Sequence, residues 1–158
     1  MQELHLPGYA FKVRSAPQGE QIFDLVRRKY VALTPEEWVR QHFLNFLIDH
    51  RGCPASLIKV ERGIPARSIQ MRADIIIHGT DGKPAALVEC KSPDVTMNEG
   101  SFAQVIRYNS FLKTGYIILT NGLVHYCCKL VDGGNTVVPQ VEIPTYKEMV
   151  ELSDTIRK

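Results

Sequence analysis

The sequence predicts a mixed α/β fold, in which helices flank a mixed central sheet and a short hairpin precedes it. Short runs of apolar, β-branched residues alternate along the chain with longer segments whose apolar residues recur at helical spacing. At 158 residues and 44% hydrophobic content, the chain is long enough to enclose a sizeable core. We therefore expect one domain over residues 1–158, with its core at about residues 30–130.

The N-terminal hairpin is predicted from two short segments on either side of a turn. Residues 9–13 and 21–23 flank the turn sequence Pro17-Gln18-Gly19. A helix follows, with Thr34 as its predicted N-cap and Pro35 as its first residue. The apolar stripe of this helix, which ends at Arg51-Gly52, comprises Val39, Phe43, Phe46 and Leu47.

The central sheet is predicted from five apolar runs. Strands are expected at residues 57–61, 73–78, 85–91, 116–120 and 124–129. Asp81-Gly82 is a strong two-residue turn signal, so the second and third strands should form a hairpin. A helix at residues 101–112 follows this hairpin, and a capping-box pattern from Thr145 to Glu148 opens a C-terminal helix.

Charged residues interrupt the apolar sequence of that hairpin. Asp74 lies in its first strand, and Glu89-Cys90-Lys91 closes its second strand. Side chains alternate along a strand, so Glu89 and Lys91 share one face and Cys90 lies on the other. If the register places Asp74 beside Glu89, two carboxylates and an ammonium converge. A solvated sheet face is the plain alternative, but the apolar neighbours indicate burial on both faces, where unpaired charge is costly.

Two converging carboxylates and an ammonium suit the hydrolysis of a phosphodiester. This reaction needs charge neutralised on the phosphate and a hydroxide formed near neutral pH, and Mg²⁺ or Mn²⁺ on hard oxygen ligands supplies both. We expect Asp74, Glu89 and the backbone carbonyl of Cys90 to bind the metal, and Asp74, Glu89 and Lys91 to be catalytic. Three roles are open to Lys91: orienting water, deprotonating it, or stabilising charge on the phosphate.

Gln104 and Tyr108 lie four residues apart, hence on one face of the predicted helix at residues 101–112. An amide and a phenol can hydrogen-bond a phosphate or a metal-bound water without adding negative charge, which suits substrate positioning. The alternative is a half-buried glutamine and a tyrosine at the edge of the core, and without the neighbouring motif this alternative would be preferred.

The spacing of these motifs resembles that of a known nuclease superfamily. Asp74 followed by Glu89-x-Lys91 is similar to the PD-(D/E)xK pattern, although Ala73 stands where the pattern has proline. Gln104 and Tyr108 resemble the Gln-x-x-x-Tyr motif of its RecB-like and type I restriction branches. The resemblance reverses the preference at these two residues and implies a restriction-endonuclease-like core.

Longer matches resemble the N-terminal nuclease domain of type I restriction enzyme R (motor) subunits, from about residue 30 to about residue 128. The matching segments are Thr34–Gln41, Arg72–Asp74, Val88–Pro93, Arg107–Asn109 and Leu119–Gly122. The resemblance implies an Mg²⁺-dependent hydrolase of DNA, with Mn²⁺ as an alternative ion, in a restriction-modification system with motor and specificity subunits as partners. The chain itself contains no P-loop glycine-lysine motif of a motor domain.

Glu37 has two competing explanations. In the resembling family, a carboxylate on the first helix, followed three residues later by arginine, reaches the metal site, and Glu37 and Arg40 match that spacing. Alternatively, Glu37 and Thr34 form a capping box and satisfy each other's backbone N–H groups. We retain Glu37 as a candidate metal ligand, with Glu36 as a substitute.

Composition narrows the remaining possibilities. A net charge of +2 is only mildly basic, so a nucleic-acid surface must come from local clustering. The run Arg27-Arg28-Lys29 either follows a nucleic-acid backbone or is simply solvated, and Lys59, Glu61 and Arg62 are expected to be surface charge. The four cysteines form no C-x-x-C pair and the histidines form no spaced metal set, so zinc is not expected.

No apolar run is long enough to span a membrane and Met1-Gln2-Glu3 begins no signal peptide, so a soluble cytoplasmic protein without a membrane partner is expected. Two functional classes follow: a metal-dependent deoxyribonuclease, or a non-cleaving nucleic-acid-binding or protein-binding module on a nuclease fold. Intact Asp74, Glu89 and Lys91 favour the nuclease, because a module without catalysis has no reason to retain buried charges.

Overall fold

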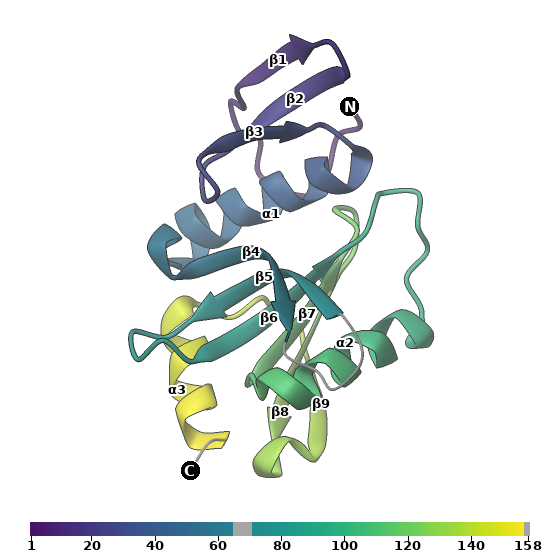
Figure 1. The fold of residues 1–158 in the computed structure, drawn as a ribbon. Helices are drawn as coiled ribbons and strands as arrows, with labels where there is room; N and C mark the ends of the chain where they lie inside the picture. The colour runs from purple at the N-terminus through teal and green to yellow at the C-terminus, as the bar shows by residue number, and fades with distance from the viewer. Residues whose placement is uncertain (65–70, 157–158) are drawn as a thin grey trace.

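The computed structural model describes residues 1–64 and 71–156, which form two sheets and three α-helices (Figure 1). The N-terminal sheet is antiparallel, in the order β1-β2-β3. The larger sheet has the order β4-β5-β6-β7-β8-β9, and its β6–β7 pair is parallel while the other pairs are antiparallel. The predicted mixed α/β fold, with helices on a mixed sheet and an N-terminal hairpin, is confirmed.

The bounds of the elements follow the chain order. The N-terminal sheet contains β1 (Val13–Ala16), β2 (Gly19–Asp24) and β3 (Lys29–Ala32). The larger sheet contains β4 (Ile58–Ile64), β5 (Met71–His78), β6 (Pro84–Cys90), β7 (Tyr116–Thr120), β8 (His125–Val131) and β9 (Thr136–Gln140). The helices are α1 (Pro35–Arg51), α2 (Glu99–Leu112) and α3 (Tyr146–Ile156).

The larger sheet is covered on both faces, so its central strands are buried (Figure 1). Helices α1 and α3 pack on one face, in a cluster that includes Phe43, Leu47, Ile75, Val88 and Met149. Helix α2 packs on the other face, in a cluster that includes Ile76, Leu87, Val105, Ile117 and Leu119. Burial on both faces explains why β6 and β7 are almost wholly apolar in sequence. Within the described ranges, no helix has both the length and the apolar character needed to cross a membrane.

Local capping signals fix where the helices begin and end. The Thr34 hydroxyl accepts the Glu37 amide at 3.0 Å, and Gly52 ends α1 in the left-handed region at φ 73°. Helix α3 begins as predicted, because the Glu148 carboxylate accepts the Thr145 amide at 2.7 Å and the Thr145 hydroxyl accepts the Glu148 amide at 3.3 Å. Helix α2 begins two residues before its predicted start, because Asn98 caps it.

The N-terminal sheet differs in detail from the predicted hairpin. Its first strand is residues 13–16 instead of 9–13, because the rings of Tyr9 and Phe11 lie against His42 of α1, with centroids 6.2 and 4.6 Å away. The strand β3 was not predicted; its register pairs Tyr30 with Phe23. Strand β9 was also missed, because it is short, largely exposed and carries Pro139, which is typical of an edge strand.

The strand β5 is irregular beside Asp74. Its pairing with β6 runs from His78 to Ile75, where Ile75 lies opposite Val88. Ala73 and Ile76 both pack on the α2 side, although regular alternation would place residues three apart on opposite faces. On the neighbouring strand, Glu61 interrupts the β4–β5 pairing with a left-handed φ of 51°. This break frees the Asp74 side chain from the strict alternation of the strand.

Candidate functional site

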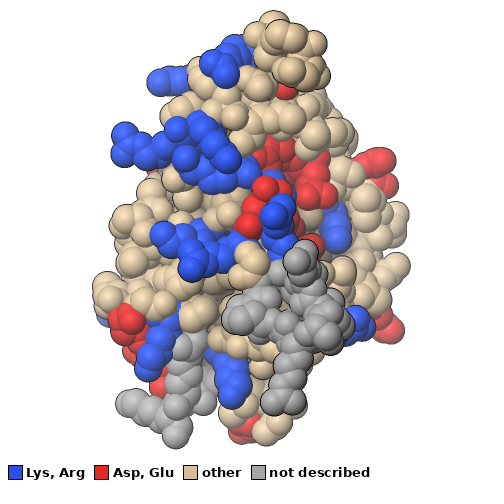
Figure 2. Space-filling view, viewed as in Figure 1, with Lys and Arg blue, Asp and Glu red and all other residues tan. Residues whose placement is uncertain are grey.

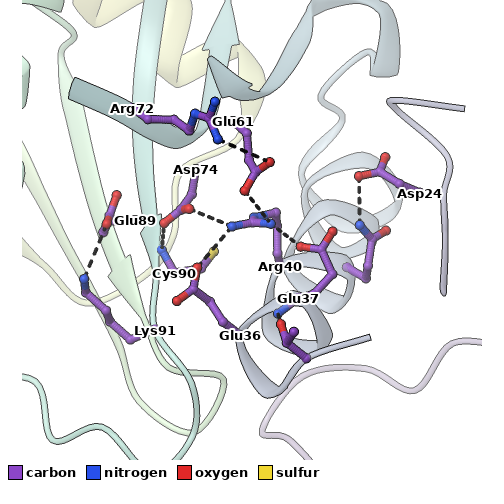
Figure 3. Close-up of polar contacts among 12 residues, drawn as sticks. Asp24, Glu36, Glu37, Arg40, Glu61, Arg72, Asp74, Glu89, Cys90 and Lys91 are labelled. Carbon is purple, nitrogen blue, oxygen red and sulfur yellow. Dashed lines mark hydrogen bonds and ion pairs between the residues drawn. The ribbon is translucent and has the colours of Figure 1, made fainter. Parts of the chain in front are cut away.

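Asp74 lies where β5, β6 and α1 meet, and both of its carboxylate oxygens are bonded (Figure 3). Its Oδ2 accepts the backbone amide of Cys90 at 2.8 Å, and its Oδ1 accepts Nη2 of Arg40 at 2.8 Å. Residues from three separate elements therefore fix this carboxylate. The Asp74 side chain is only 12% exposed, so the positive charge of Arg40 stabilises it in its ionised form.

Glu89 shares this site with Asp74 and Lys91. Its Oε1 lies 3.5 Å from the Lys91 ammonium, while its Oε2 is buried and has no hydrogen-bond partner in the described part of the chain. Burial raises the pKa of the Glu89 carboxyl to about 8, the negative charge of Asp74 adds to the rise, and Lys91 opposes it. The structure thus brings Asp74, Glu89 and Lys91 together; their catalytic roles, and the Cys90 carbonyl as a ligand, stay predictions.

The raised pKa of Glu89 predicts a loss of stability with rising pH. A carboxyl whose pKa is higher in the folded state stabilises the fold below its unfolded pKa, and this contribution is lost as the pH rises through the folded pKa. Between pH 6 and pH 8 the free energy of unfolding should fall by at most about 2–3 kcal/mol, at about 1.36 kcal/mol per pH unit. Urea titrations in chelator measure this fall as the difference between wild type and Glu89→Gln, which keeps the shape of the side chain without its charge. An equal pH dependence in both proteins would contradict the predicted burial of a titrating Glu89.

Glu37 is directed away from Asp74. Its two oxygens pair with Arg27 and Arg40, so its carboxylate neither reaches the Thr34 amide nor joins Glu89. Thr34 does cap the Glu37 amide, so the helix start has half of the predicted capping box. Burial raises the pKa of Glu37, and the two arginines oppose this rise. The structure therefore gives Glu37 the role of a buried ion-pair partner, which neither of the two sequence explanations describes.

Glu36, the substitute ligand, is the carboxylate of α1 that faces the site. It lies 3.2 Å from Arg40 and its side chain is 46% exposed. Burial raises its pKa, with the charge of Asp74 as the next cause, while Lys91 acts in the opposite direction. The interaction with both Asp74 and Lys91 places Glu36 at the edge of the candidate site.

An ion-pair network beneath the site was missed by sequence reasoning. Arg27 Nε lies 2.6 Å from Asp24 and its Nη1 lies 3.1 Å from Glu61, while Arg40 Nη1 lies 3.5 Å from Glu61. Arg27 is 15% exposed and fully paired, so its predicted roles as a solvated or nucleic-acid-binding residue are wrong. Glu61 likewise belongs to this network instead of being plain surface charge. The network joins residues that are far apart in sequence, so no local spacing signals it.

Gln104 and Tyr108 share one face of α2, as predicted, and bond to each other. Gln104 Nε2 donates to the Tyr108 hydroxyl at 3.0 Å, and both side chains are half-buried. Tyr108 packs against the α2-side core, which includes Leu87, two residues before Glu89 on β6. Over the described residues no hydrogen bond connects either side chain to the carboxylates, so the substrate-positioning role of both stays a prediction.

Other titratable residues lie outside the site. His78 Nδ1 is 3.3 Å from the Leu57 carbonyl, at the far end of β5. The four cysteines, Cys53, Cys90, Cys127 and Cys128, are buried free thiols. Within residues 1–64 and 71–156, no group of three or more histidine, cysteine, aspartate and glutamate side chains is placed to hold a metal. A cation at this site would therefore bind two carboxylates and draw its other ligands from backbone or solvent.

An open groove of about 730 Å³ adjoins the site. It runs between β3, the start of α1, Glu61 and the segment that follows β6, and its lining includes Lys29, Tyr30, Glu36, Arg40 and Asp94. Figure 2 shows acidic atoms gathered near the centre of this face, with Lys and Arg atoms beside and above them. Glu36 and Arg40, which border Asp74, make the groove an approach to the carboxylates.

Comparisons with known proteins agree with this fold. Residues 35–144 match a family profile described as type I restriction enzyme R protein N terminus. A solved fragment, described as an HsdR subunit of a type I restriction enzyme from Vibrio vulnificus YJ016, has a TM-score of 0.58 and 20% sequence identity. The match covers 80% of this chain and 26% of that chain, so this chain spans about a quarter of the length of the solved fragment. No curated protein sequence matches the chain significantly.

Proposed function

Because the chain belongs to the family of type I restriction enzyme R protein N termini, we propose that it is a metal-dependent nuclease of the PD-(D/E)xK type that hydrolyses DNA phosphodiester bonds. One observation carries the proposal: a buried Glu89 carboxylate, with an unsatisfied Oε2, lies beside the buried carboxylate of Asp74. A catalytic site explains this arrangement, because two buried carboxylates repel each other unless a proton or a cation neutralises them.

The residues present fit a hard divalent cation. Glu89 Oε2 has free lone pairs, and carboxylate oxygens are the ligands that Mg²⁺ and Mn²⁺ prefer. Asp74, Glu89 and the Cys90 carbonyl would hold the ion. When bound, Mg²⁺ supplies charge neutralisation at the phosphate and lowers the pKa of water. This use of Glu89 also explains why the fold tolerates an unsatisfied buried oxygen, which costs stability in a purely structural role.

Lys91 supplies the positive charge that the chain itself holds at this point. Its ammonium lies 3.5 Å from Glu89 and its side chain is 26% exposed, so it contacts both the buried carboxylate and solvent. From this position it can donate hydrogen bonds to a phosphate oxygen or hold a water molecule by its oxygen. Asp74 is oriented from the other side by Arg40 and the Cys90 amide, so the reacting groups are held by different elements.

The assay of the proposal uses the purified chain on supercoiled, linear and single-stranded DNA. We expect cleavage with Mg²⁺ or Mn²⁺ and none in chelator. The same assay with motor and specificity subunits of a restriction system tests whether the chain acts with these partners in the cytoplasm, as the family suggests. Absence of cleavage under every one of these conditions would contradict the proposal.

A second candidate function is a non-cleaving module that binds nucleic acid or protein on the same fold. The observation that favours it is the Arg40–Asp74 pair, because Asp74 is already neutralised at Oδ1 by an arginine at 2.8 Å. In such a module, Asp74 would be structural, and DNA binding would persist without cleavage under any divalent cation.

Gln104→Ala should weaken both DNA binding and cleavage, because Gln104 is proposed to position the substrate. The loss of one polar contact is worth about 0.5–1.5 kcal/mol, so each quantity should fall by about 2–12-fold, less than for a carboxylate variant. The fold should survive, since a half-buried polar side chain is removed. DNA affinity and initial rate are measured with Ser110→Ala, an exposed residue of the same helix, as the matched control. Wild-type values for both quantities would assign Gln104 to the support of Tyr108 alone.

A further inference from the structure

We propose that the N-terminal sheet binds the phosphate backbone of DNA through Arg14 and Lys29, at the rim of the groove that leads to Asp74. This inference rests on the proposed function and adds to it the surface that carries the substrate. Two contacts connect the sheet to the site: Lys29 and Tyr30 line the groove together with Glu36 and Arg40, and Arg40 bonds to Asp74.

Arg14 is held in a fixed orientation over this rim. Its guanidinium carbon lies 3.8 Å from the centroid of the Tyr30 ring, and its Nε donates to Gln21 Oε1 at 2.9 Å. Stacking and this hydrogen bond use the ring face and Nε, so the two terminal nitrogens keep their donors for an incoming acceptor. Such an ordered guanidinium suits phosphate, whose oxygens it can bind in pairs.

Unpaired positive charge gathers on the N-terminal sheet. Among the residues that the structure describes, Lys12, Arg14, Arg28 and Lys29 are exposed and take part in no ion pair. In contrast, Arg27 in the same segment and Arg40 on α1 are consumed by carboxylates. Figure 2 shows the resulting Lys and Arg atoms on the upper part of the molecule, next to the acidic centre.

The surface chemistry favours the DNA backbone over its bases. Arg14 covers a face of Tyr30, and the Lys12 ammonium lies 5.7 Å from the centroid of the Phe23 ring, so cations already occupy these aromatic faces. Bases that stack on a protein need uncovered aromatic faces, whereas phosphates need the free donors that Arg14 and Lys29 present. Binding at this rim should therefore depend on salt and be insensitive to base sequence.

The experiment measures the affinity of a fluorescent DNA duplex by anisotropy in chelator, between about 25 and 150 mM salt. Arg14→Ala/Lys29→Ala should lower the slope of log K against log salt by about 1.8, from about 0.9 per lost phosphate contact. At 0.1 M salt the same slope gives about eightfold weaker binding for each lost contact. The matched control, Lys83→Ala/Lys147→Ala, removes two exposed lysines from the β5–β6 turn and from α3 and should bind like wild type.

The outcomes separate this inference from the proposed function. A slope and affinity equal to those of the control variant would overturn the inference, even if the wild type cleaves DNA in Mg²⁺. A wild type that binds through Arg14 and Lys29 but never cleaves would overturn the nuclease proposal alone. Should the alanine variant unfold by circular dichroism, Arg14→Gln/Lys29→Gln keeps the side-chain stems and tests the same loss of charge. A short acidic peptide that binds more tightly than duplex DNA would identify a protein partner and refute the assignment to DNA.

Discussion

Lys91→Ala should abolish DNA cleavage while leaving DNA affinity nearly unchanged. The Lys91 ammonium lies beside Glu89, where it acts on charge and proton position in the transition state, and groups of this kind contribute about 10²–10⁴-fold to rate. Affinity instead comes from many backbone contacts, of which one lysine is a small part. Rates are measured in Mg²⁺, and affinity in Ca²⁺, which binds oxygen ligands as Mg²⁺ does and is expected to support little cleavage.

Lys83→Ala is the matched control for this change. Lys83 is an exposed lysine in the β5–β6 turn, at the end of β6 remote from Lys91, so its removal should alter neither rate nor affinity. A Lys91→Ala protein that cuts at the rate of Lys83→Ala would contradict the proposed chemistry. A protein that loses affinity and rate in equal measure would make Lys91 a binding residue.

Asp74→Asn should weaken Mn²⁺ or Mg²⁺ binding at least about 100-fold. Changes in residues that only orient metal ligands already cost 10–100-fold, and the loss of a ligand's charge should cost at least as much for a hard cation. Calorimetric titration measures the binding, and Asp94→Asn, an exposed carboxylate of the same groove, is the control. Cation binding of Asp74→Asn at the strength of the control would move the site elsewhere.

Asp74→Asn also removes the charge that neutralises Arg40, so folding must be measured beside binding. Breaking a buried ion pair by neutralising one partner costs about 3–5 kcal/mol. Glu37 and Glu61 still neutralise Arg40 in this variant, which should bring the cost toward the lower end. A folded variant that no longer binds metal separates the two effects.

Elements with local signals were predictable from the sequence. The α1 cap at Thr34, the turn at Asp81-Gly82 and the box at Thr145 depend on residues a few positions apart, and each forms as predicted, with Gly82 at φ 80°. The approach of Asp74 to Glu89 also follows from strand pairing, because Ile75 lies opposite Val88 and the next positions on each strand are these two residues.

What escaped prediction depends on contacts between distant segments. Nothing near Glu61 in the sequence reveals its left-handed backbone, which places its carboxylate beside Arg27 and Arg40. Arg27 belongs to a basic run that suggests a surface, yet Asp24 and Glu37 hold it inside the protein. An isolated motif states which residue types are present, whereas their partners depend on the fold.

The choice between neighbouring carboxylates on α1 illustrates the same limit. Glu36 and Glu37 are adjacent at the start of the helix, and a spacing argument favours Glu37. In the folded chain Arg27 and Arg40 take Glu37, and Glu36 is the residue whose pKa responds to Asp74. The sequence spacing located the right turn of the helix and left the choice of side chain to tertiary contacts.

The most direct test of the central claim is plasmid cleavage by the wild type and by Asp74→Asn/Glu89→Gln, purified in parallel. The double variant controls for contaminating nucleases, because it passes through the same purification without the two carboxylate charges. The account predicts that the wild type converts supercoiled DNA in Mg²⁺ but not in chelator, and that the double variant leaves it intact in both. Equal conversion by the two proteins, or conversion by the wild type in chelator, would contradict a metal-dependent site at Asp74 and Glu89.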